Sequence, residues 1–179
     1  MTPPPVALAH TAALSPDQLA AARALIYRCF DDMTESDWEH ALGGMHALAY
    51  DEQGELIGHA ALVQRRLVHR GRALRTGYVE AVGVGPAHRR RGHAGRLMAE
   101  LERVIRGAYE LGALGATDVG ARLYAARGWQ RWRGPTSALT PAGVVRTPEE
   151  DGCVFVFGAR VELDFTGELT CDYRDGDAW

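Results

Sequence analysis

Residues 78–97 constrain the fold of this chain most, because they have the pattern of a strand, a short basic loop and the start of a helix. The strand part, residues 78–84, is rich in valine and alternates between two faces, which is typical of a pleated core segment. The helical part repeats apolar side chains with charges between them, at Leu97, Met98, Leu101, Val104, Ile105 and Ala108. This order predicts a helix that packs on a sheet.

The loop between the strand and the helix predicts an anion site. Residues 89–94 match the pattern Arg-x-x-Gly-x-Ala. Gly92 lets the backbone come close to a ligand, and the first N–H groups of the following helix have no partner within it. These donors and the positive end of the helix dipole favour a pyrophosphate. An arginine run alone is more often a solvated face, but its place between strand and helix favours binding.

Length and composition set the scale of the protein. A chain of 179 residues with 46% hydrophobic residues can bury one good core, so we expect a flexible tail at residues 1–5 and a single domain over residues 6–179. The apolar run at residues 56–63 is too short to cross a membrane, and the first residues lack the order of a signal peptide. We therefore expect a soluble, cytoplasmic protein. Three widely spaced cysteines indicate neither a disulfide framework nor a metal site.

The charges are segregated along the chain although the net charge is only −3. All basic side chains apart from histidine are arginine, and they concentrate in residues 65–106, whereas acids concentrate in residues 31–55 and 149–177. A basic middle suits a polyanionic cofactor and acidic flanks suit a cationic substrate, whereas a nucleic-acid partner would require a net basic domain. The alternative is that the acidic segments are simply solvated surfaces.

The first half of the chain predicts two helices and a three-stranded meander. Ser15 and Gln18 form a capping box before a helix, and Thr34 with Asp37 starts a second helix that ends before two glycines. We expect strands at residues 6–10, 45–50 and 56–68, and a turn at residues 69–72 that leads into the strand carrying Glu80. Three consecutive strands imply antiparallel pairing.

The second half predicts shorter elements. We expect a strand or turn at residues 114–117, a helix at residues 118–127 ended by Gly128, and closing strands at residues 129–133 and 154–157. A proline-bearing loop joins the closing strands, and a polar tail leads to Trp179. The fold class is α/β (α+β), with a mixed, mostly antiparallel central sheet flanked by helices.

The segment at residues 78–97 resembles the acyl-CoA loop of the GNAT superfamily of N-acetyltransferases, and the order of elements fits the GNAT fold. Other segments are similar to aminoglycoside 2′-N-acetyltransferases, and the similarity runs from about Asp32 to the last residue. These segments are residues 34–40, 42–47, 64–67, 77–80, 106–114, 123–129, 134–137 and 171–179.

The resemblance implies a catalytic role for three positions. Glu80 is the expected general base for a protonated amine, and Tyr124 is the expected proton donor to the leaving thiolate. The backbone N–H of Val82 is expected to face the thioester oxygen, where a bulge that Gly83 would permit splays the strand. Alternatively, Glu80 is an ion-paired strand carboxylate and Tyr124 is a core residue whose hydroxyl is satisfied.

The resemblance also implies the binding residues and the assembly. Acetyl-CoA is the expected co-substrate, held by Val82, Val84, Arg89, Arg90, Arg91, Gly92, His93, Ala94 and Gly95. An aminoglycoside is the expected substrate. The charge of a polycationic sugar favours contacts with the acidic residues Asp32, Asp37, Glu80, Glu150, Asp151 and Asp177 and with the terminal carboxylate of Trp179, and the resemblance itself points to Asp37, Asp177 and Trp179. Asp37 has an alternative role in capping the second helix. A homodimer is expected, with no nucleic-acid or membrane partner.

Two departures from the family bear on specificity. Gly115 stands where the family often has serine, and Glu150 stands where it tends to have aspartate, so the sequence leaves open whether a deoxystreptamine drug or the smaller kasugamycin fits. Two other functions stay open. In the first, the chain is an acetyltransferase for a different small amine or a peptide N-terminus. In the second, it is a non-catalytic CoA-binding module, and the presence of both Glu80 and Tyr124 disfavours this second alternative.

Overall fold

The computed structural model describes residues 6–179, so the tail predicted at residues 1–5 lies outside the described residues. The chain forms two compact units. The first unit comprises the chain up to Val63 together with Val79–Arg103, and the second comprises Gln64–Tyr78 and Val104–Trp179. Strands β3 (Leu56–His69) and β4 (Arg72–Val84) and helix α3 (His93–Ala108) each contribute to both units. The single domain over residues 6–179 stays a prediction.

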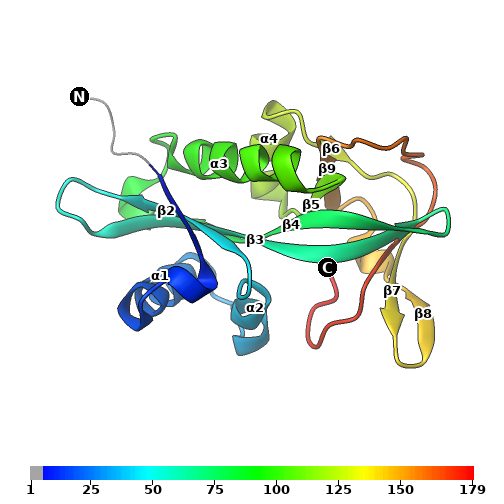
Figure 1. Ribbon diagram of the computed structural model, residues 1–179, viewed down its shortest axis with the longest axis horizontal. Coiled ribbons are helices and arrows are strands. Elements are labelled where there is room, and N and C mark those ends of the chain that lie inside the picture. Colours follow the sequence, from blue (N-terminus) through cyan, green and yellow to red (C-terminus); the bar gives the residue numbers. More distant parts are fainter. Residues whose placement is uncertain (1–5) are drawn as a thin grey trace. The chain divides into compact units, whose positions relative to one another are not determined.

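The first unit is a small sheet covered by helices on both faces (Figure 1). Its remaining elements are β1 (Ala7–His10), η1 (Thr11–Ala13), α1 (Pro16–Cys29), α2 (Glu35–His40), β2 (Met45–Tyr50) and η2 (Pro86–His88). β1 pairs antiparallel with β2, and β2 pairs antiparallel with β3. Helices α1 and α2 lie on one face of these strands and α3 lies on the other. These elements confirm the strands and helices predicted for the first half of the chain.

Capping and apolar burial explain why the helices of the first unit form where they do. Both predicted capping boxes are present, at Ser15 with Gln18 and at Thr34 with Asp37. Ile26 of α1 and Trp38 of α2 pack in one cluster with Leu48 of β2 and with β3. Each large side chain buried in this way contributes about 1.5–3 kcal/mol, so the cluster fixes both helices on the sheet.

The second unit is built on a longer sheet. Its remaining elements are β5 (Leu111–Gly115), α4 (Asp118–Ala126), β6 (Gln130–Arg131), β7 (Thr136–Thr140), β8 (Gly143–Arg146), η3 (Pro148–Glu150), β9 (Val154–Phe157) and β10 (Leu169–Cys171). The strand order is β6-β9-β5-β4-β3-β10-β7-β8. The β4–β5 and β10–β7 pairs are parallel, while β10–β3, β5–β9, β6–β9 and β7–β8 are antiparallel. The mixed, mostly antiparallel sheet with flanking helices confirms the predicted fold class.

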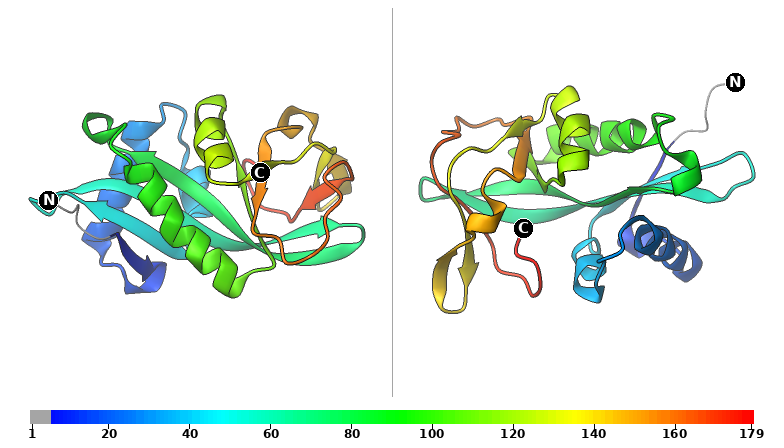
Figure 2. Two further views of the ribbon diagram at one scale, coloured as in Figure 1. Left: turned by 90° about the horizontal axis from the view of Figure 1, so that it is seen from above. Right: turned by 180° about the vertical axis from the view of Figure 1, so that it is seen from behind.

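Three predictions about the second half were wrong, and long-range pairing explains each. The strand predicted at residues 114–117 is instead β5, which begins at Leu111 because it pairs with Thr76–Tyr78 of β4. The predicted proline-bearing loop contains the β7–β8 hairpin, and the predicted polar tail contains β10, which lies between β3 and β7 (Figure 2). Two- to five-residue strands carry little periodicity, so their partners decide whether they form.

Among residues 6–179, no helix is both long enough and apolar enough to span a membrane.

Candidate active site

The predicted site residues are divided between the two units. The first unit carries Asp32, Asp37, Glu80, Val82, Val84 and the loop residues Arg89, Arg90, Arg91, Gly92, His93, Ala94 and Gly95. The second unit carries Tyr124, Glu150, Asp151, Asp177 and Trp179. Each group has its own internal geometry.

Glu80 is half-buried on β4, next to a residue, Ala81, whose left-handed backbone interrupts the extended conformation of the strand. We call this irregularity the break in β4. The following residue, Ala81, has φ of 50°, which is left-handed and costs a residue with a Cβ about 1–2 kcal/mol. Backbone strain of this kind is typical of functional sites. The break therefore separates the predicted base, Glu80, from the predicted backbone donor, Val82.

The break lies at Ala81 and not at Gly83, where the sequence suggested it. Gly83 is buried, and a Cβ added to it would lie 2.7 Å from Cδ1 of Ile26 and 3.0 Å from Sγ of Cys29. Gly83 therefore allows α1 to pack closely on β4. The sequence predicts that Gly83 provides the conformational freedom for the bulge, but Gly83 is needed here for its small size.

The loop before α3 has the geometry of an anion site. Arg90 and Gly92 have positive φ values of 60° and 82°, and a Cβ at Gly92 would meet no atom within 4 Å. Arg96 N–H donates to Gly92 O at 3.2 Å, so the amides of residues 93–95 precede the first hydrogen bond of the helix. The backbone at Gly92 is thus open to a ligand. The amides of residues 93–95 stand at the positive N-terminal end of α3, a helix of 16 residues.

His93 adds a further polar group to this loop. Its Nδ1 atom is buried and has no hydrogen-bond partner among the described residues. Burial, followed by the nearby Arg96, His88 and Arg91, lowers the pKa of His93. A buried polar atom without a partner is costly, and a polar ligand at the loop would satisfy it. Arg89, in contrast, is folded back, since its Nε donates to Val84 O at 3.1 Å.

The two aspartates of the first unit differ in how their side chains are used. Asp32 is exposed in a turn before α2. Asp37 Oδ2 accepts from Thr34 N–H at 2.8 Å and from Thr34 Oγ1 at 2.7 Å, so this carboxylate caps α2. Both bonds use the same oxygen, and Oδ1 makes no hydrogen bond to residues 6–179. The cap therefore leaves one oxygen of Asp37 for a ligand.

Tyr124 lies on α4 and is largely buried. Its ring contacts Trp129 and Phe155, with centroids 6.1 Å and 6.4 Å away. Burial raises the pKa of Tyr124 to about 12, so the phenol keeps its proton throughout the neutral range. These facts support both earlier interpretations, because the ring is part of the core while the hydroxyl carries a proton that it can donate.

Glu150 and Asp177 form an acidic pair in the second unit. Glu150 ends η3 and is half-buried, whereas Asp177 is exposed in the tail. Burial first, and then the charges of Asp177 and Glu149, raise the pKa of Glu150. Two carboxylates that repel each other form a favourable place for an ammonium group, which relieves the repulsion.

Asp151, the neighbour of Glu150, is used within the protein. Its Oδ1 accepts from Thr136 N–H at 2.8 Å and from Thr136 Oγ1 at 2.9 Å, and its Oδ2 accepts from Arg146 Nη2 at 2.8 Å. These bonds lower the pKa of Asp151, first through Arg146 and then through Thr136. Its substrate role stays a prediction, but this carboxylate already holds η3 to the β7–β8 hairpin.

The tail is fixed by polar contacts. Trp179 is buried, its Nε1 donates to Thr147 Oγ1 at 2.9 Å, and its N–H donates to Asp177 Oδ1 at 3.1 Å. Arg65 of β3 donates to Ala178 O at 2.8 Å. A Cβ at Gly115 would lie 3.8 Å from the carbonyl carbon of Trp179. The glycine that departs from the family pattern thus lies next to the docked end of the tail.

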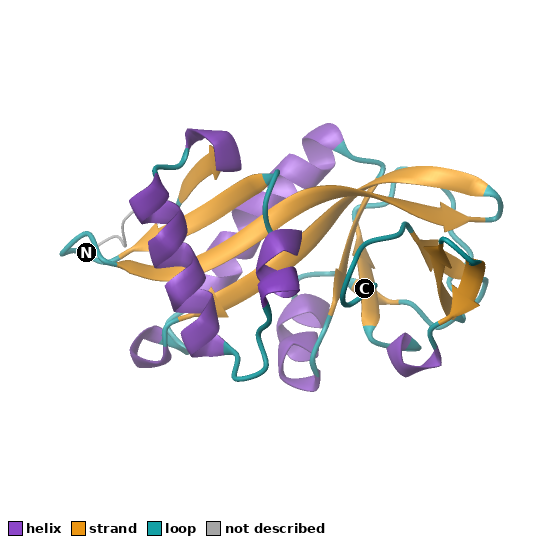
Figure 3. Cartoon of the chain, turned by 90° about the horizontal axis from the view of Figure 1, so that it is seen from below, coloured by secondary structure: helices purple, strands orange, loops and turns teal. Residues whose placement is uncertain are grey.

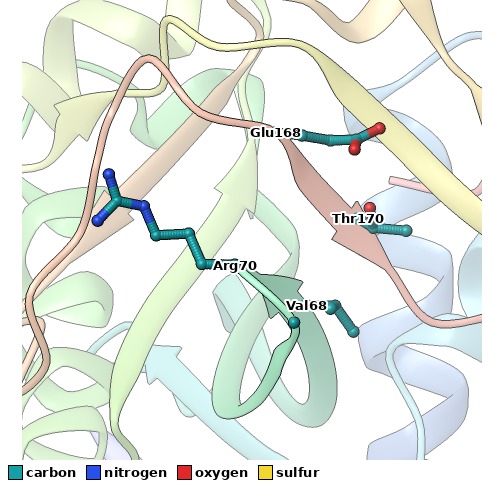
Figure 4. A pocket seen from close by; sticks show the side chains of 5 residues that line it. Val68, Arg70, Glu168 and Thr170 are labelled. Carbon is teal, nitrogen blue, oxygen red and sulfur yellow. The ribbon is translucent and has the colours of Figure 1, made fainter.

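A separate pocket of about 290 Å³ lies in the second unit, at the turn between β3 and β4 (Figure 4). It is lined by Val68, Arg70, Gly71, Glu168 and Thr170. Arg70 Nη2 forms an ion pair with Asp164 at 2.8 Å, and Glu168 accepts from Ser137 Oγ at 2.6 Å. Both charged groups are therefore paired within the protein, and no predicted site residue lines this pocket.

Sequence reasoning did not identify a buried histidine pair in the first unit. His46 of β2 and His59 of β3 are fully buried and joined by a hydrogen bond of 2.9 Å. His59 Nδ1 also lies 2.9 Å from the carbonyl oxygen of Ala81, the residue at the break in β4. The signal in the sequence is a histidine on each of two predicted apolar strands, but the pairing register is needed to bring them together.

Fold and sequence comparisons agree on the class of this protein. Residues 11–132 match the family model described as "Acetyltransferase (GNAT) domain". The chain belongs to this family of acetyltransferases. It is 52% identical to an aminoglycoside 2′-N-acetyltransferase of Mycolicibacterium fortuitum, over 96% of this chain and 90% of that protein.

Solved structures share the fold. YhbS of Escherichia coli, a GNAT family N-acetyltransferase solved in complex with CoA, superposes with a TM-score of 0.62 and 18% identity, over 95% of this chain and 92% of that one. Eis1 of Mycobacterium abscessus superposes with a TM-score of 0.60 and 24% identity, over 74% of this chain but only 33% of the longer Eis1 chain.

Proposed function

We propose that this chain transfers the acetyl group of acetyl-CoA to the 2′-amine of an aminoglycoside and thereby confers resistance. The observation that carries the proposal is the 52% identity over 96% of the chain to a protein with that activity. Identity at this level extends beyond the shared fold.

The loop before α3 supports the choice of acetyl-CoA as co-substrate. It offers an open backbone at Gly92, free amides at the start of α3 and the unpartnered Nδ1 of His93. These groups suit a pyrophosphate, and the arginines of residues 89–91 supply positive charge. The YhbS structure, which shares the fold, was solved with CoA.

The acidic residues of both units support a polycationic substrate. Burial, and then the charge of Asp177, raise the pKa of Glu150, and Asp37 keeps one oxygen outside its helix cap. A charge-assisted hydrogen bond from an ammonium to such a carboxylate contributes about 1.5–3 kcal/mol. An aminoglycoside carries several ammonium groups, so separate carboxylates add to its affinity.

The chemistry proposed for the residues is direct transfer. Glu80 takes a proton from the substrate ammonium, directly or through water, and the freed amine nitrogen bonds to the thioester carbonyl carbon as the carbon–sulfur bond breaks. The N–H of Val82 hydrogen-bonds the thioester oxygen. Tyr124 donates its proton to the departing sulfur, which its raised pKa permits because the phenol is protonated at neutral pH. The second proton, which the nitrogen loses as the amide forms, returns through water to the Tyr124 oxygen. The products are an acetamide and free CoA.

A homodimer and a cytoplasmic location complete the proposal, both on the basis of the family resemblance. Light scattering at working concentration tests the first, and a monomer would contradict it.

The function is tested by measuring acetyl-CoA consumption against a panel of deoxystreptamine aminoglycosides and kasugamycin, with mass spectrometry of the product locating the acetyl group. We expect acetylation at the 2′-amine. Acetylation only at other amines would contradict the proposed regiochemistry, and no turnover with any member would favour another amine substrate or a CoA-binding module.

A further inference from the structure

We propose that His59 and His46 are positioning residues for the reaction. They form a neutral, hydrogen-bonded pair that holds the carbonyl of Ala81 and so fixes the left-handed break in β4 between Glu80 and Val82. This inference rests on the proposed function, because Glu80 and Val82 are the base and the backbone donor in that proposal.

The pair has a place in the fold that explains its rigidity. β2 and β3 pair antiparallel with Leu48 opposite His59 and Ala61 opposite His46, so both imidazoles share the face on which Leu48 and Ala61 pack against α1 and α2. Figure 3 shows the two helices across this face of the strands. Trp38 of α2 packs against His59, with ring centroids 5.9 Å apart. Buried between a sheet and two helices, the rings have little freedom to rotate.

The hydrogen bonds assign a proton to each ring nitrogen. A carbonyl oxygen can only accept, so the Nδ1 atom of His59 that lies 2.9 Å from Ala81 O carries hydrogen and donates it. In a neutral imidazole the other nitrogen is then an acceptor, so His59 Nε2 accepts from His46 Nδ1 at 2.9 Å. His46 Nε2 in turn accepts from Thr11 Oγ1 at 2.8 Å.

The series of hydrogen bonds begins before the two histidines, at Gly43 and Thr11. Gly43 N–H donates to Thr11 Oγ1 at 2.9 Å, and the hydroxyl of Thr11 has two possible acceptors, Gly44 O at 3.2 Å and His46 Nε2 at 2.8 Å. The hydrogen is assigned to His46, the nearer of the two, because a neutral imidazole that donates from Nδ1 can only accept at Nε2. Burial lowers the pKa of both imidazoles to about 4, so both are neutral at physiological pH and the assignment of one proton to each ring holds. Every link therefore points in the same direction, toward Ala81 O.

The last hydrogen bond of this series, from His59 to Ala81 O, bears on catalysis because Ala81 lies between Glu80 and Val82. Its φ of 50° is disfavoured for alanine, so the conformation needs support from its surroundings. The bond from His59 fixes the peptide that follows Ala81, and that peptide contains the N–H of Val82. A rotation of this peptide would turn the proposed donor away and change the direction of β4 next to Glu80.

Kinetic variants test the inference in the full chain. We expect His59→Leu to lower kcat about 10- to 100-fold, as misplaced catalytic groups do, while the KM for acetyl-CoA stays close to that of wild type. His59→Asn, whose amide nitrogen occupies a position similar to Nδ1, keeps a donor for Ala81 O and should recover most of kcat. Equal losses in both variants would overturn the inference.

His69→Leu is the matched control. His69 is also buried, and its Nδ1 lies 2.9 Å from the carbonyl oxygen of Glu168, but it belongs to the second unit and to the pocket end of β3. Its loss should lower the melting temperature as the loss of His59 does and leave kcat of the folded protein close to wild type. If His69→Leu lowers kcat as much as His59→Leu, the effect is general destabilisation and the inference fails.

A spectroscopic measurement separates this inference from the proposed function and covers the case in which His59→Leu does not fold. Nitrogen-15 NMR of the substrate-free protein should show both imidazoles neutral with hydrogen on Nδ1. His46→Leu removes the donor to His59 Nε2, but Ala81 O still requires hydrogen on His59 Nδ1, so we expect the Nδ1–H tautomer of His59 to persist and kcat to fall less than in His59→Leu. A protonated pair in wild type, or hydrogen on His59 Nε2 in place of Nδ1, would overturn the inference whatever the substrate. Failure of all aminoglycosides to react, with these tautomers observed, would instead overturn the proposed function.

Discussion

Together with burial, the largest cause, the charge of Asp177 raises the pKa of Glu150 although 26 residues separate the two carboxylates in the sequence. The tail is fixed by Trp179 and Arg65, so Asp177 is held where it repels the half-buried carboxylate of η3. Repulsion of this kind destabilises the folded protein at neutral pH and is relieved by a bound cation. The repulsion therefore lowers the stability of the free protein and raises its affinity for a substrate that carries ammonium groups.

Glu150→Gln tests this relationship through stability. The folded-state pKa of Glu150 is raised above its ordinary value, so folding binds its proton more tightly and the free energy of unfolding falls as pH rises through the raised pKa. At neutral pH the folded protein bears the cost of the ionised Glu150 carboxylate. The substitution removes this cost and should raise the free energy of unfolding by roughly 0.2–1 kcal/mol. Thermal melts should show this gain at neutral pH and lose it below about pH 4. A constant gain at every pH would contradict the electrostatic explanation.

Asp177→Asn tests the same carboxylates through binding. We expect the free energy of aminoglycoside binding to weaken by about 1.5–3 kcal/mol, because one charge-assisted bond is lost, while acetyl-CoA binding is unchanged. Asp175→Asn is the control, since it removes the same charge from the same tail, where its carboxylate accepts from Tyr173 at 2.8 Å. Calorimetric titration that gives equal losses for both variants would indicate a nonspecific effect of net charge.

Glu80→Gln tests the general base. The substitution keeps the size of the side chain and removes its capacity to take a proton, so kcat should fall about 10²- to 10⁴-fold. Acetyl-CoA binding, measured directly by titration, should be unchanged. A near-normal rate across the pH range would disprove the assignment and leave Glu80 as a structural carboxylate.

Tyr124→Phe tests the proton donor. We expect a smaller loss of kcat than for Glu80→Gln and an unchanged melting temperature, because the ring and its contacts with Trp129 and Phe155 remain. The raised pKa, about 12, predicts that ionisation of Tyr124 does not limit the wild-type rate near neutral pH. If the melting temperature collapses and the rate of the folded fraction is normal, Tyr124 serves only the core.

Gly92→Val tests the loop. A β-branched side chain at φ of 82° is strained and obstructs approach to the backbone, so the KM for acetyl-CoA should rise strongly while aminoglycoside binding stays measurable. Gly54→Val is the matched control, because Gly54 also has a positive φ, of 84°, and open space around it, in the turn between β2 and β3. Steady-state kinetics of both variants decide the matter. If Gly54→Val raises the KM equally, backbone strain is the cause and the loop is not the binding site.

Much of the first unit could be predicted from the sequence because local interactions decide it. The capping boxes at Ser15 and Thr34 fix where α1 and α2 begin, and the glycine-containing turn at Gly54 joins β2 to β3. The loop at Gly92 was predicted for the same reason, since a glycine with positive φ and a helix N-terminus are local features. The family resemblance added the roles of Glu80 and Tyr124, which no local pattern assigns.

Tertiary structure alone decided the rest, since it depends on residues far apart in the chain. β10 forms because β3 and β7 pair with it on either side. The pKa of Glu150 is raised by burial and then by the charge of Asp177, which the docked tail holds near it. The break at Ala81, with Gly83 reserved for close packing against α1, is supported by a histidine on a neighbouring strand. The sequence by itself determined which segments become helices, turns and long strands, because caps, glycines and apolar periodicity act within a few residues. Only the folded chain decided which buried polar groups meet, because a hydrogen bond such as that from His59 to Ala81 depends on the register and packing of strands that are distant in sequence.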